Sequence, residues 1–173
     1  MEQITIDETD LKLLDSLQTD ASLSNQALAE RAHISPPTCL RRVKRLRDAG
    51  LVEREIAVLS TDKLAVITGH GLTALVEITL ERQGAEQQEA FEARVVQDDA
   101  VQQCYRVSPG PDFMLVMQVP DMPGYHALVQ RLFTEDANVR NVKAFFSVHR
   151  AKFQPAIALP ASSRAGPGRT DRR

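Results

Sequence analysis

The sequence predicts an α+β protein of two units, and three observations along the chain lead to that prediction. Residues 7–51 carry apolar side chains at the three- and four-residue spacing of amphipathic helices. Residues 52–59 and 72–81 alternate apolar and polar side chains, as strands with one buried face do. From residue 72 onward the predicted elements run strand, helix, strand, strand, helix, strand. A helical unit is therefore expected first and a sheet domain after it.

Composition narrows the class of protein. Of the 173 residues, 43% are hydrophobic and 25% charged, which is ordinary for a globular protein. No apolar run approaches the roughly 18 residues of a membrane span, and Met1 opens no signal-peptide pattern. We therefore expect a cytoplasmic protein without membrane contact. The two cysteines, Cys39 and Cys104, are too few for a disulfide framework and are expected to be buried, reduced thiols.

The first unit has the pattern of a helix-turn-helix. Asp7 is placed to cap a first helix, in which leucines recur at helical spacing. Ser24 is placed to cap a short second helix, Asn25–Ala32, and Ser35 a third. Two short helices joined by a few residues, the second of them basic, are typical of helix-turn-helix DNA-binding domains.

The segment 35–51 concentrates positive charge on one predicted helix. Pro36 suits its first position, and Gly50 suits its end because glycine adopts the left-handed conformation there. Five basic residues face one acid within residues 35–49, although the net charge of the chain is −2. Such focused charge favours a docked recognition helix over diffuse adhesion to nucleic acid. The residues expected in the core, away from DNA, are Cys39, Leu40, Val43 and Leu46.

Composition and periodicity divide the chain into four segments. Residues 1–51 form the predicted helix-turn-helix domain, which is expected to be winged-helix-like. Residues 52–71 are expected to hold a linking strand, Val52–Leu59, and a hinge of mixed character. Residues 72–153 form the predicted sheet domain. Residues 154–173, rich in Ala, Pro, Gly, Ser and Arg, are expected to be a disordered tail.

The sheet domain follows the β-α-β-β-α-β order of the ferredoxin-like split arrangement. Alternating apolar residues over Leu72–Leu80 predict its first strand, and the breaker-rich turn 108–112 separates its second and third strands. The remaining predicted elements are a helix at Gln87–Gln97, strands at Val101–Val107 and Phe113–Val119, a helix from Met122 to about Phe133, and a last strand marked by Val142, Ala144, Phe146 and Val148.

The sequence predicts no enzyme, no cofactor and no metal site. Its four histidines lie in four different elements, without cysteine or carboxylate partners at ligand spacing. No nucleophile elbow, P-loop or dinucleotide fingerprint is present.

Several motifs in this order resemble a known family. They are Asp10–Asp15, Ser24-Asn25, Ser35-Pro36 followed by Cys39-Leu40, Gly50-Leu51-Val52, Val76–Leu80 and Val119–Met122. Over residues 7–153 the chain resembles regulators of the Lrp/AsnC class, the leucine-responsive and asparagine regulators also called feast/famine regulators. The resemblance implies a transcriptional regulator that binds double-stranded DNA and whose C-terminal domain dimerises and senses amino acids. It also implies homodimers, which in this family often assemble into tetramers or octamers.

The predicted DNA contacts centre on the basic helix. Residues at the start of a recognition helix tend to reach base edges, which assigns Pro37, Thr38, Arg41 and Arg42 to the groove. Residues further along more often meet phosphates. A solvated basic face is the alternative. The full predicted set is Ser24, Asn25, Ser35, Pro36, Pro37, Thr38, Arg41, Arg42, Lys44, Arg45 and Arg47.

The resemblance also implies an effector pocket between subunits of neighbouring dimers, near the turn between the second and third strands of the C-terminal domain. The turn departs from the family pattern because Pro109 and Gly110 replace its usual glycine and first acid. Prolines remove N–H donors that the carboxylate of an amino acid commonly needs. Asp112 is expected either to hold the α-ammonium group or to stabilise the turn, and Phe145 and Phe146 either to line the pocket or simply to pack. The predicted effector residues are Ser108, Pro109, Gly110, Asp112, Met122, Phe145, Phe146 and Ser147.

The leading prediction is thus a sequence-specific, amino-acid-responsive transcriptional regulator. The alternative is an architectural DNA-binding protein with little effector response, which the prolines of the turn favour. A small-molecule-binding module that regulates an enzyme through the sheet domain is a third reading, but it leaves the basic helix unexplained.

Overall fold

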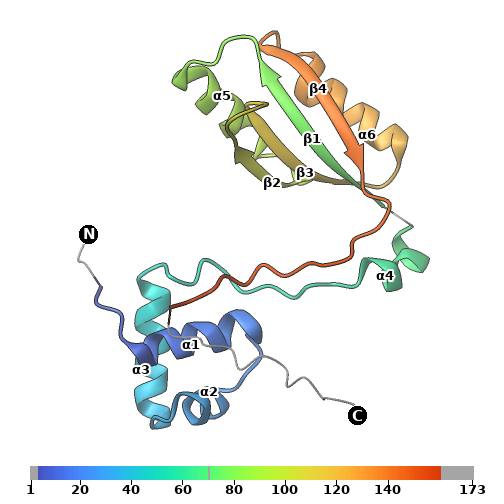
Figure 1. Ribbon diagram of the computed structural model, residues 1–173. Coiled ribbons are helices and arrows are strands. Elements are labelled where there is room, and N and C mark those ends of the chain that lie inside the picture. The colour runs from blue at the N-terminus through green and yellow to red at the C-terminus, as the bar shows by residue number, and fades with distance from the viewer. Residues whose placement is uncertain (1–3, 70, 161–173) are drawn as a thin grey trace, which may run out of the picture. The chain divides into compact units, whose positions relative to one another are not determined.

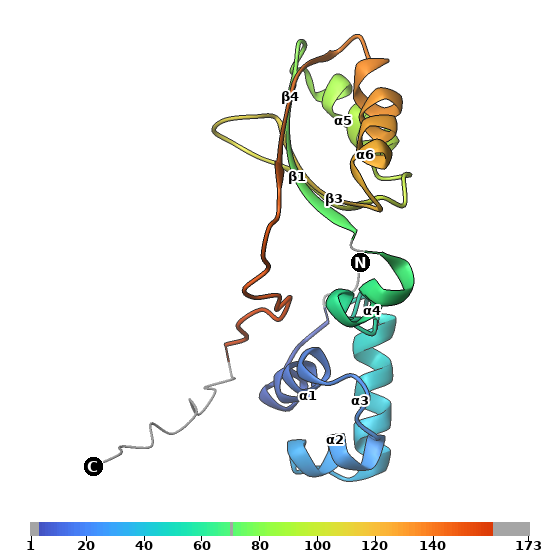
Figure 2. The same cartoon turned by 90° about the vertical axis from the view of Figure 1, so that its right-hand side faces the viewer.

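The computed structural model describes residues 4–69 and 71–160. Within them, one compact unit runs to Ala57 and includes the segment that begins at Phe153, and the other spans Val58–Lys152. Figures 1 and 2 show a helical first unit and a second unit in which helices cover a sheet. The α+β prediction is confirmed.

The first unit consists of three helices, α1 (Glu8–Thr19), α2 (Asn25–Ala32) and α3 (Pro36–Asp48). Asp7 caps α1 as predicted, through a reciprocal pair in which Asp10 N–H donates to Asp7 Oδ1 at 2.9 Å and Asp7 N–H donates to Asp10 Oδ2 at 3.2 Å. Ser24 caps α2 by accepting from the N–H of Ala27 at 3.2 Å. These caps satisfy N–H groups that have no partner within their helices.

Ser35 occupies the cap position of α3 but its side chain makes no capping bond, so that part of the prediction is wrong. Pro36 and Pro37 remove the N–H groups of the first two helical positions. The Ser35 hydroxyl instead pairs with the Thr38 hydroxyl at 2.8 Å. At the other end, Gly50 adopts φ +72, the left-handed conformation expected of it.

The core of the helical unit differs from the prediction at Leu40, whose side chain is 62% exposed. The buried stripe of α3 is Cys39, Val43 and Leu46, at spacings of four and three. Leu40 lies one position round from Cys39 and so faces away from the stripe. The core consists of Leu13, Leu17, Leu28, Ala29, Ala32, Cys39, Val43 and Leu46.

The predicted linking strand is wrong for this chain. Residues 53–60 are irregular and exposed, because the described residues offer them no neighbouring strand to complete a ladder. The predicted hinge instead contains a helix, α4 (Thr61–Thr68), capped by the Ser60 hydroxyl, which accepts from Lys63 N–H at 3.4 Å. Val66 and Ile67 of α4 are 92% and 82% exposed.

The second unit contains a four-stranded antiparallel sheet in the order β2-β3-β1-β4, and the two helices that follow β1 and β3 cover one of its faces (Figure 2). This is the predicted β-α-β-β-α-β arrangement. The last strand ends before Val148, which is fully exposed rather than part of it. The elements are β1 (Leu72–Leu80), α5 (Ala85–Val95), β2 (Val101–Arg106), β3 (Phe113–Val119), α6 (Met122–Val129), the π-helical turn η1 (Gln130–Thr134) and β4 (Val139–Phe146).

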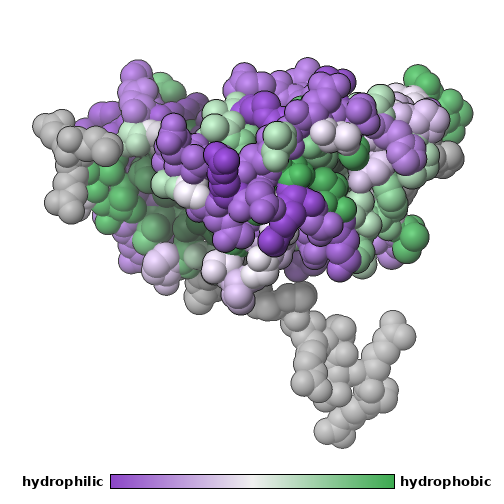
Figure 3. All heavy atoms as spheres, turned by 90° about the horizontal axis from the view of Figure 1, so that it is seen from above, coloured by the Kyte–Doolittle hydropathy of each residue, from purple (hydrophilic) through white to green (hydrophobic). Residues whose placement is uncertain are grey.

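Alternate residues of β1 lie on the two faces of the sheet, one buried and the other open. Ala74, Val76 and Ile78 are fully buried beneath the helices. Leu75, on the other face, is 38% exposed and pairs in register with Val116 and Phe145. Exposed apolar side chains thus lie on the open face. Figure 3, a view from above, shows hydrophilic and hydrophobic side chains interspersed over that face of the molecule.

The sequence predicted a disordered tail from residue 154 onward. The described part of that segment is instead hydrogen-bonded to α1. The Ile157 N–H donates to Gln18 Oε1 at 3.0 Å, and the Gln18 side-chain amide donates to the Ile157 carbonyl at 2.9 Å. The backbone near Ile157 is therefore held against α1. The rest of the predicted tail, residues 161–173, lies outside the described residues.

Candidate nucleic-acid interface

Helix α3 exposes one side of its surface because its apolar stripe faces α1 and α2. Pro36 and Pro37 are exposed at its beginning, and Thr38 is half-buried. The Asn25 side-chain amide donates to the Pro36 carbonyl at 2.9 Å, which joins the start of α2 to the start of α3. The predicted contacts at the starts of α2 and α3 thus come together, whereas the predicted basic contacts Lys44, Arg45 and Arg47 lie further along α3.

The basic residues of α3 differ in their partners. Arg41 is exposed and makes no hydrogen bond or ion pair with any described residue. Lys44 pairs with Asp48 at 2.6 Å, and Arg47 Nε donates to Glu55 at 3.1 Å. Both pairs are exposed, and exposed ion pairs contribute little to stability, so competing anions displace them readily.

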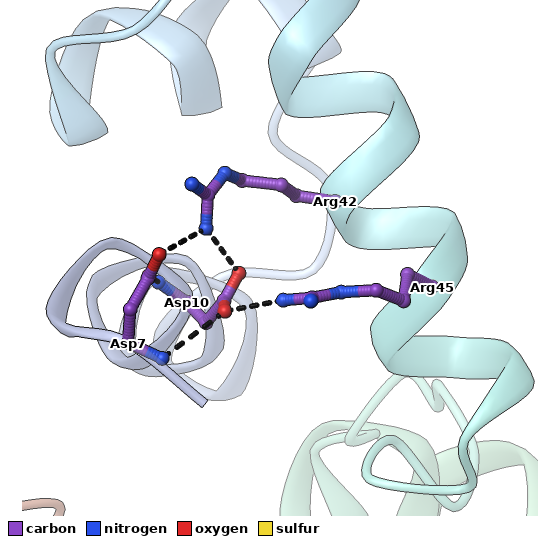
Figure 4. A network of polar contacts seen from close by, with 4 residues as sticks. All are labelled: Asp7, Asp10, Arg42 and Arg45. Atoms are coloured by element: carbon purple, nitrogen blue, oxygen red, sulfur yellow. Dashed lines mark hydrogen bonds and ion pairs between the residues drawn. The ribbon is translucent and has the colours of Figure 1, made fainter. Parts of the chain in front are cut away.

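Arg42 and Arg45 are held in another way, by carboxylates of α1 and its cap (Figure 4). Arg42 Nη1 donates to Asp7 Oδ2 at 2.7 Å and to Asp10 Oδ1 at 2.9 Å. Arg45 pairs with the other oxygen of Asp10. A hollow of about 130 Å³ lined by Asp7, Arg41, Arg42 and Arg45 lies beside this network.

This network perturbs two ionisation equilibria. The backbone N–H of Asp10 and the Arg42 guanidinium lower the pKa of Asp7. Hydrogen bonds to Asp7 and Asp10 raise the pKa of Arg42. The sequence indicated Asp7 and Asp10 only as acids suited to a helix N-terminus. Their long-range pairing with α3 carries no local signal and was missed.

The predicted effector residues separate into two groups along β1. The turn 108–112 lies at one end, where Phe113 pairs with Ile78. Phe146 pairs with Ala74, and the N–H of Ser147 donates to Thr73 at 2.9 Å, toward the other end of the strand. Four residues of a strand span about 13 Å, so one chain does not bring both groups together.

Asp112 lies beneath the turn and is only 8% exposed. Its carboxylate accepts from the backbone N–H of Leu80 at 2.7 Å and from the Gln83 amide at 3.3 Å. Ser108, Pro109 and Gly110 are exposed above it. The contacts of Asp112 within the chain are those of a turn-stabilising residue.

The other predicted effector residues lie at the surface of the sheet domain. Met122 begins α6 and is 40% exposed. Phe146 packs edge-on against Tyr125, with ring centroids 4.9 Å apart. Phe145 lies on the opposite, open face, where the Lys143 ammonium sits 4.6 Å from its ring centroid.

In residues 4–69 and 71–160, no group of three or more His, Cys, Asp or Glu side chains is placed to hold a metal ion. The same residues include no helix with the length and apolar character needed to cross a membrane.

Comparison with known proteins decides the family. Residues 6–53 match a family model described as winged helix-turn-helix DNA-binding, and residues 73–157 match the Lrp/AsnC ligand binding domain. The chain is 32% identical over 147 residues to the leucine-responsive regulatory protein of Salmonella typhimurium, covering 85% of this chain and 87% of that protein. This chain belongs to the Lrp/AsnC family. It is a DNA-binding transcriptional regulator, and the family is one of regulators rather than enzymes.

Other Lrp/AsnC relatives agree in sequence and fold. The DNA-binding transcriptional activator DecR of Escherichia coli is 31% identical over 154 residues, covering 89% of this chain and 99% of that protein. A transcriptional regulator of Neisseria meningitidis, solved in complex with L-Met, has a TM-score of 0.78 and 29% identity, covering 90% of this chain and 98% of that chain.

Proposed function

We propose that this Lrp/AsnC regulator reads specific DNA sites with the exposed beginning of α3. The observation that carries the proposal is Arg41, a guanidinium that projects from the exposed face without a partner among the described residues. Such a group can bind guanine through two hydrogen bonds or contact a phosphate at little cost.

The other residues of this interface divide by position. Pro37 and Thr38 lie at the first turn, where base edges come within reach. Lys44 and Arg47 lie further along and suit phosphates. The remaining proposed contacts flank the helix start: Ser24, Asn25, Ser35 and Pro36.

We further propose a cytoplasmic homodimer formed through the open face of the sheet. Leu75, Val116 and Phe145 lie in one row across that face, and Leu75 and Phe145 are 38% and 45% exposed. Burying such a row against a second copy removes apolar surface from water. Two copies present two recognition helices, which suits operator half-sites one helical turn apart or a multiple of it.

We also propose that an amino acid effector binds the sheet domain of this regulator. This proposal rests on the match to the ligand binding domain and on the L-Met complex of the Neisseria relative. The two groups of candidate residues, at the turn 108–112 and around Met122 and Phe146, lie toward opposite ends of β1. A pocket that uses both therefore requires residues of more than one subunit.

One observation supports the alternative, an architectural DNA-binding protein with little effector response. Pro109 and Pro111 flank Gly110 in the turn and supply no N–H donors for a carboxylate. A regulator without an effector would bind DNA with modest discrimination and ignore amino acids.

One titration separates the alternatives. The purified protein is titrated into DNA that carries its own upstream region, at fixed salt, with and without each common amino acid. Specific retardation is expected, and a change of five-fold or more with one amino acid supports the sensor. Tight binding that no amino acid changes favours the architectural protein. Equal affinity for the upstream region and unrelated DNA contradicts site-specific reading.

A further inference from the structure

Asp10 is the buried carboxylate of the helical unit. Its side chain is only 1% exposed, although it lies in the first turn of α1, where other acids face water. An ionised carboxylate taken out of water is very costly unless charges and hydrogen bonds surround it. Both of its oxygens have such partners, and all the charged ones come from α3.

The two arginines that compensate Asp10 are therefore not equivalent to the other basic residues of α3. Arg42 is 25% exposed, its Nη1 is shared by Asp7 and Asp10, and its buried Nε has no partner. Arg45 also reaches back to Asp10. If either guanidinium turned toward a phosphate, one oxygen of the buried Asp10 carboxylate would lose its charged partner, and removing one partner of a buried ion pair is costly.

We propose that Asp10 is a positioning residue for DNA recognition, which withholds Arg42 and Arg45 from phosphates. The basic surface that meets DNA is then reduced to Arg41, Lys44 and Arg47. Because phosphate contacts carry no sequence information, withholding two of them lowers non-specific binding more than binding at the operator. The inference rests on the proposed function of α3, and it removes two residues from the contacts predicted from sequence.

Substitution of Asp10 tests this role through the salt dependence of binding. Asp10→Asn keeps the shape of the side chain but removes the charge that holds the arginines. Each guanidinium released to a phosphate steepens the slope of log affinity against log salt by about 0.9. We expect tighter binding to unrelated DNA, a steeper slope by about 0.9 to 1.8, and a smaller ratio of operator to non-specific affinity.

The matched control is Glu8→Gln. It removes the same charge from the same turn of α1, but Glu8 pairs with Lys12 at 2.7 Å and not with α3. Any general effect of lost negative charge appears in both variants, and only release of the arginines is specific to Asp10→Asn. Adding Arg42→Ala to Asp10→Asn should return about half of the extra slope.

Thermal unfolding followed by circular dichroism shows whether Asp10→Asn folds. If it does not fold, Asp7→Asn takes its place in the test. Asparagine caps helices as well as aspartate does, so α1 is retained. Because Asp7 shares Arg42 with Asp10, we expect a smaller steepening of the slope than Asp10→Asn gives.

Two results overturn the inference. The first is a salt slope of Asp10→Asn that equals the slope of Glu8→Gln, because the arginines are then not released. If only Asp7→Asn folds, the same comparison is made with that variant. A shallower slope means that Arg42 and Arg45 already contact DNA from the positions Asp10 gives them. Failure of the wild-type protein to bind DNA would instead refute the proposed function, so the two failures are distinguishable.

Discussion

The carboxylate of Asp112 accepts a hydrogen bond of 2.7 Å from the backbone N–H of Leu80, the last residue of β1. The N–H of Asp112 in turn donates to the Ile78 carbonyl at 2.8 Å. One residue thus joins the end of β1 to the turn before β3. Its burial and its contacts identify a part of the scaffold of the sheet domain.

Asp112→Asn should therefore reduce stability. A buried hydrogen bond to a charged acceptor contributes about 1.5–3 kcal/mol, and an amide is a weaker acceptor that must also be oriented. We expect a loss of that order in the free energy of unfolding, measured by urea denaturation. Unchanged stability together with loss of an amino acid response would show instead that Asp112 holds the effector.

Acid should weaken the helical unit through Asp7. Its pKa is lowered in the folded protein by the Asp10 N–H and by Arg42, relative to the ordinary value of 3.8. A carboxyl whose folded-state pKa is depressed adds stability above its unfolded pKa, and this is lost as pH falls through the folded value.

We therefore expect the urea midpoint to decline once the pH falls below about 4, and the decline to be smaller in Asp7→Asn. Glu8→Gln, which leaves the pair with Arg42 intact, is the control. An identical acid profile in wild type and Asp7→Asn would contradict this role of Asp7.

The thiol of Cys39 should be inert in the folded protein. It is fully buried in the core between the helices, and burial raises its pKa. Cys104 is half-buried and its pKa is raised as well, mainly by desolvation. Labelling with a thiol reagent at pH near 8 should be slow for both and slowest for Cys39. Rapid labelling of Cys39 without denaturant would show that this core opens readily.

Gly50 should resist replacement by alanine. Its φ of +72 is left-handed, and apart from its neighbours in the chain no described residue has an atom within 4 Å of the position a Cβ would take. The cost of Gly50→Ala is then conformational, about 1–2 kcal/mol in the free energy of unfolding. Gly50→Asn should cost less because asparagine tolerates this conformation better. Equal stability of both variants and wild type would mean that the turn relaxes.

Local periodicity predicted most elements of the fold. The strand Phe113–Val119 has the bounds read from the sequence, because alternating burial and a breaker-rich turn define it locally. The error at Leu40 arose because two apolar neighbours, Cys39 and Leu40, both fit a helical stripe. Only packing against α1 and α2 decides which of the two is buried.

What the sequence did not predict depends on distant partners. Val52–Leu59 alternates like a strand, but alternation supplies no neighbour to complete a ladder. Asp10 looked like a helix-terminus acid, and its pairing with Arg42 and Arg45 joins residues more than thirty positions apart. At the effector site, the register of β1 separated residues that the family pattern grouped together.

The account depends most on α3 as the DNA-contacting helix, and the salt dependence of operator binding in wild type and Arg41→Ala tests this most directly. Arg131→Ala, in the sheet domain and paired with Asp98, is the basic-to-neutral control. We predict that Arg41→Ala binds the operator more weakly than wild type. If Arg41 contacts a phosphate, the slope of log affinity against log salt falls by about 0.9. If it contacts a base, discrimination at one base pair is lost. Affinity, slope and discrimination all matching the Arg131→Ala control would contradict the account.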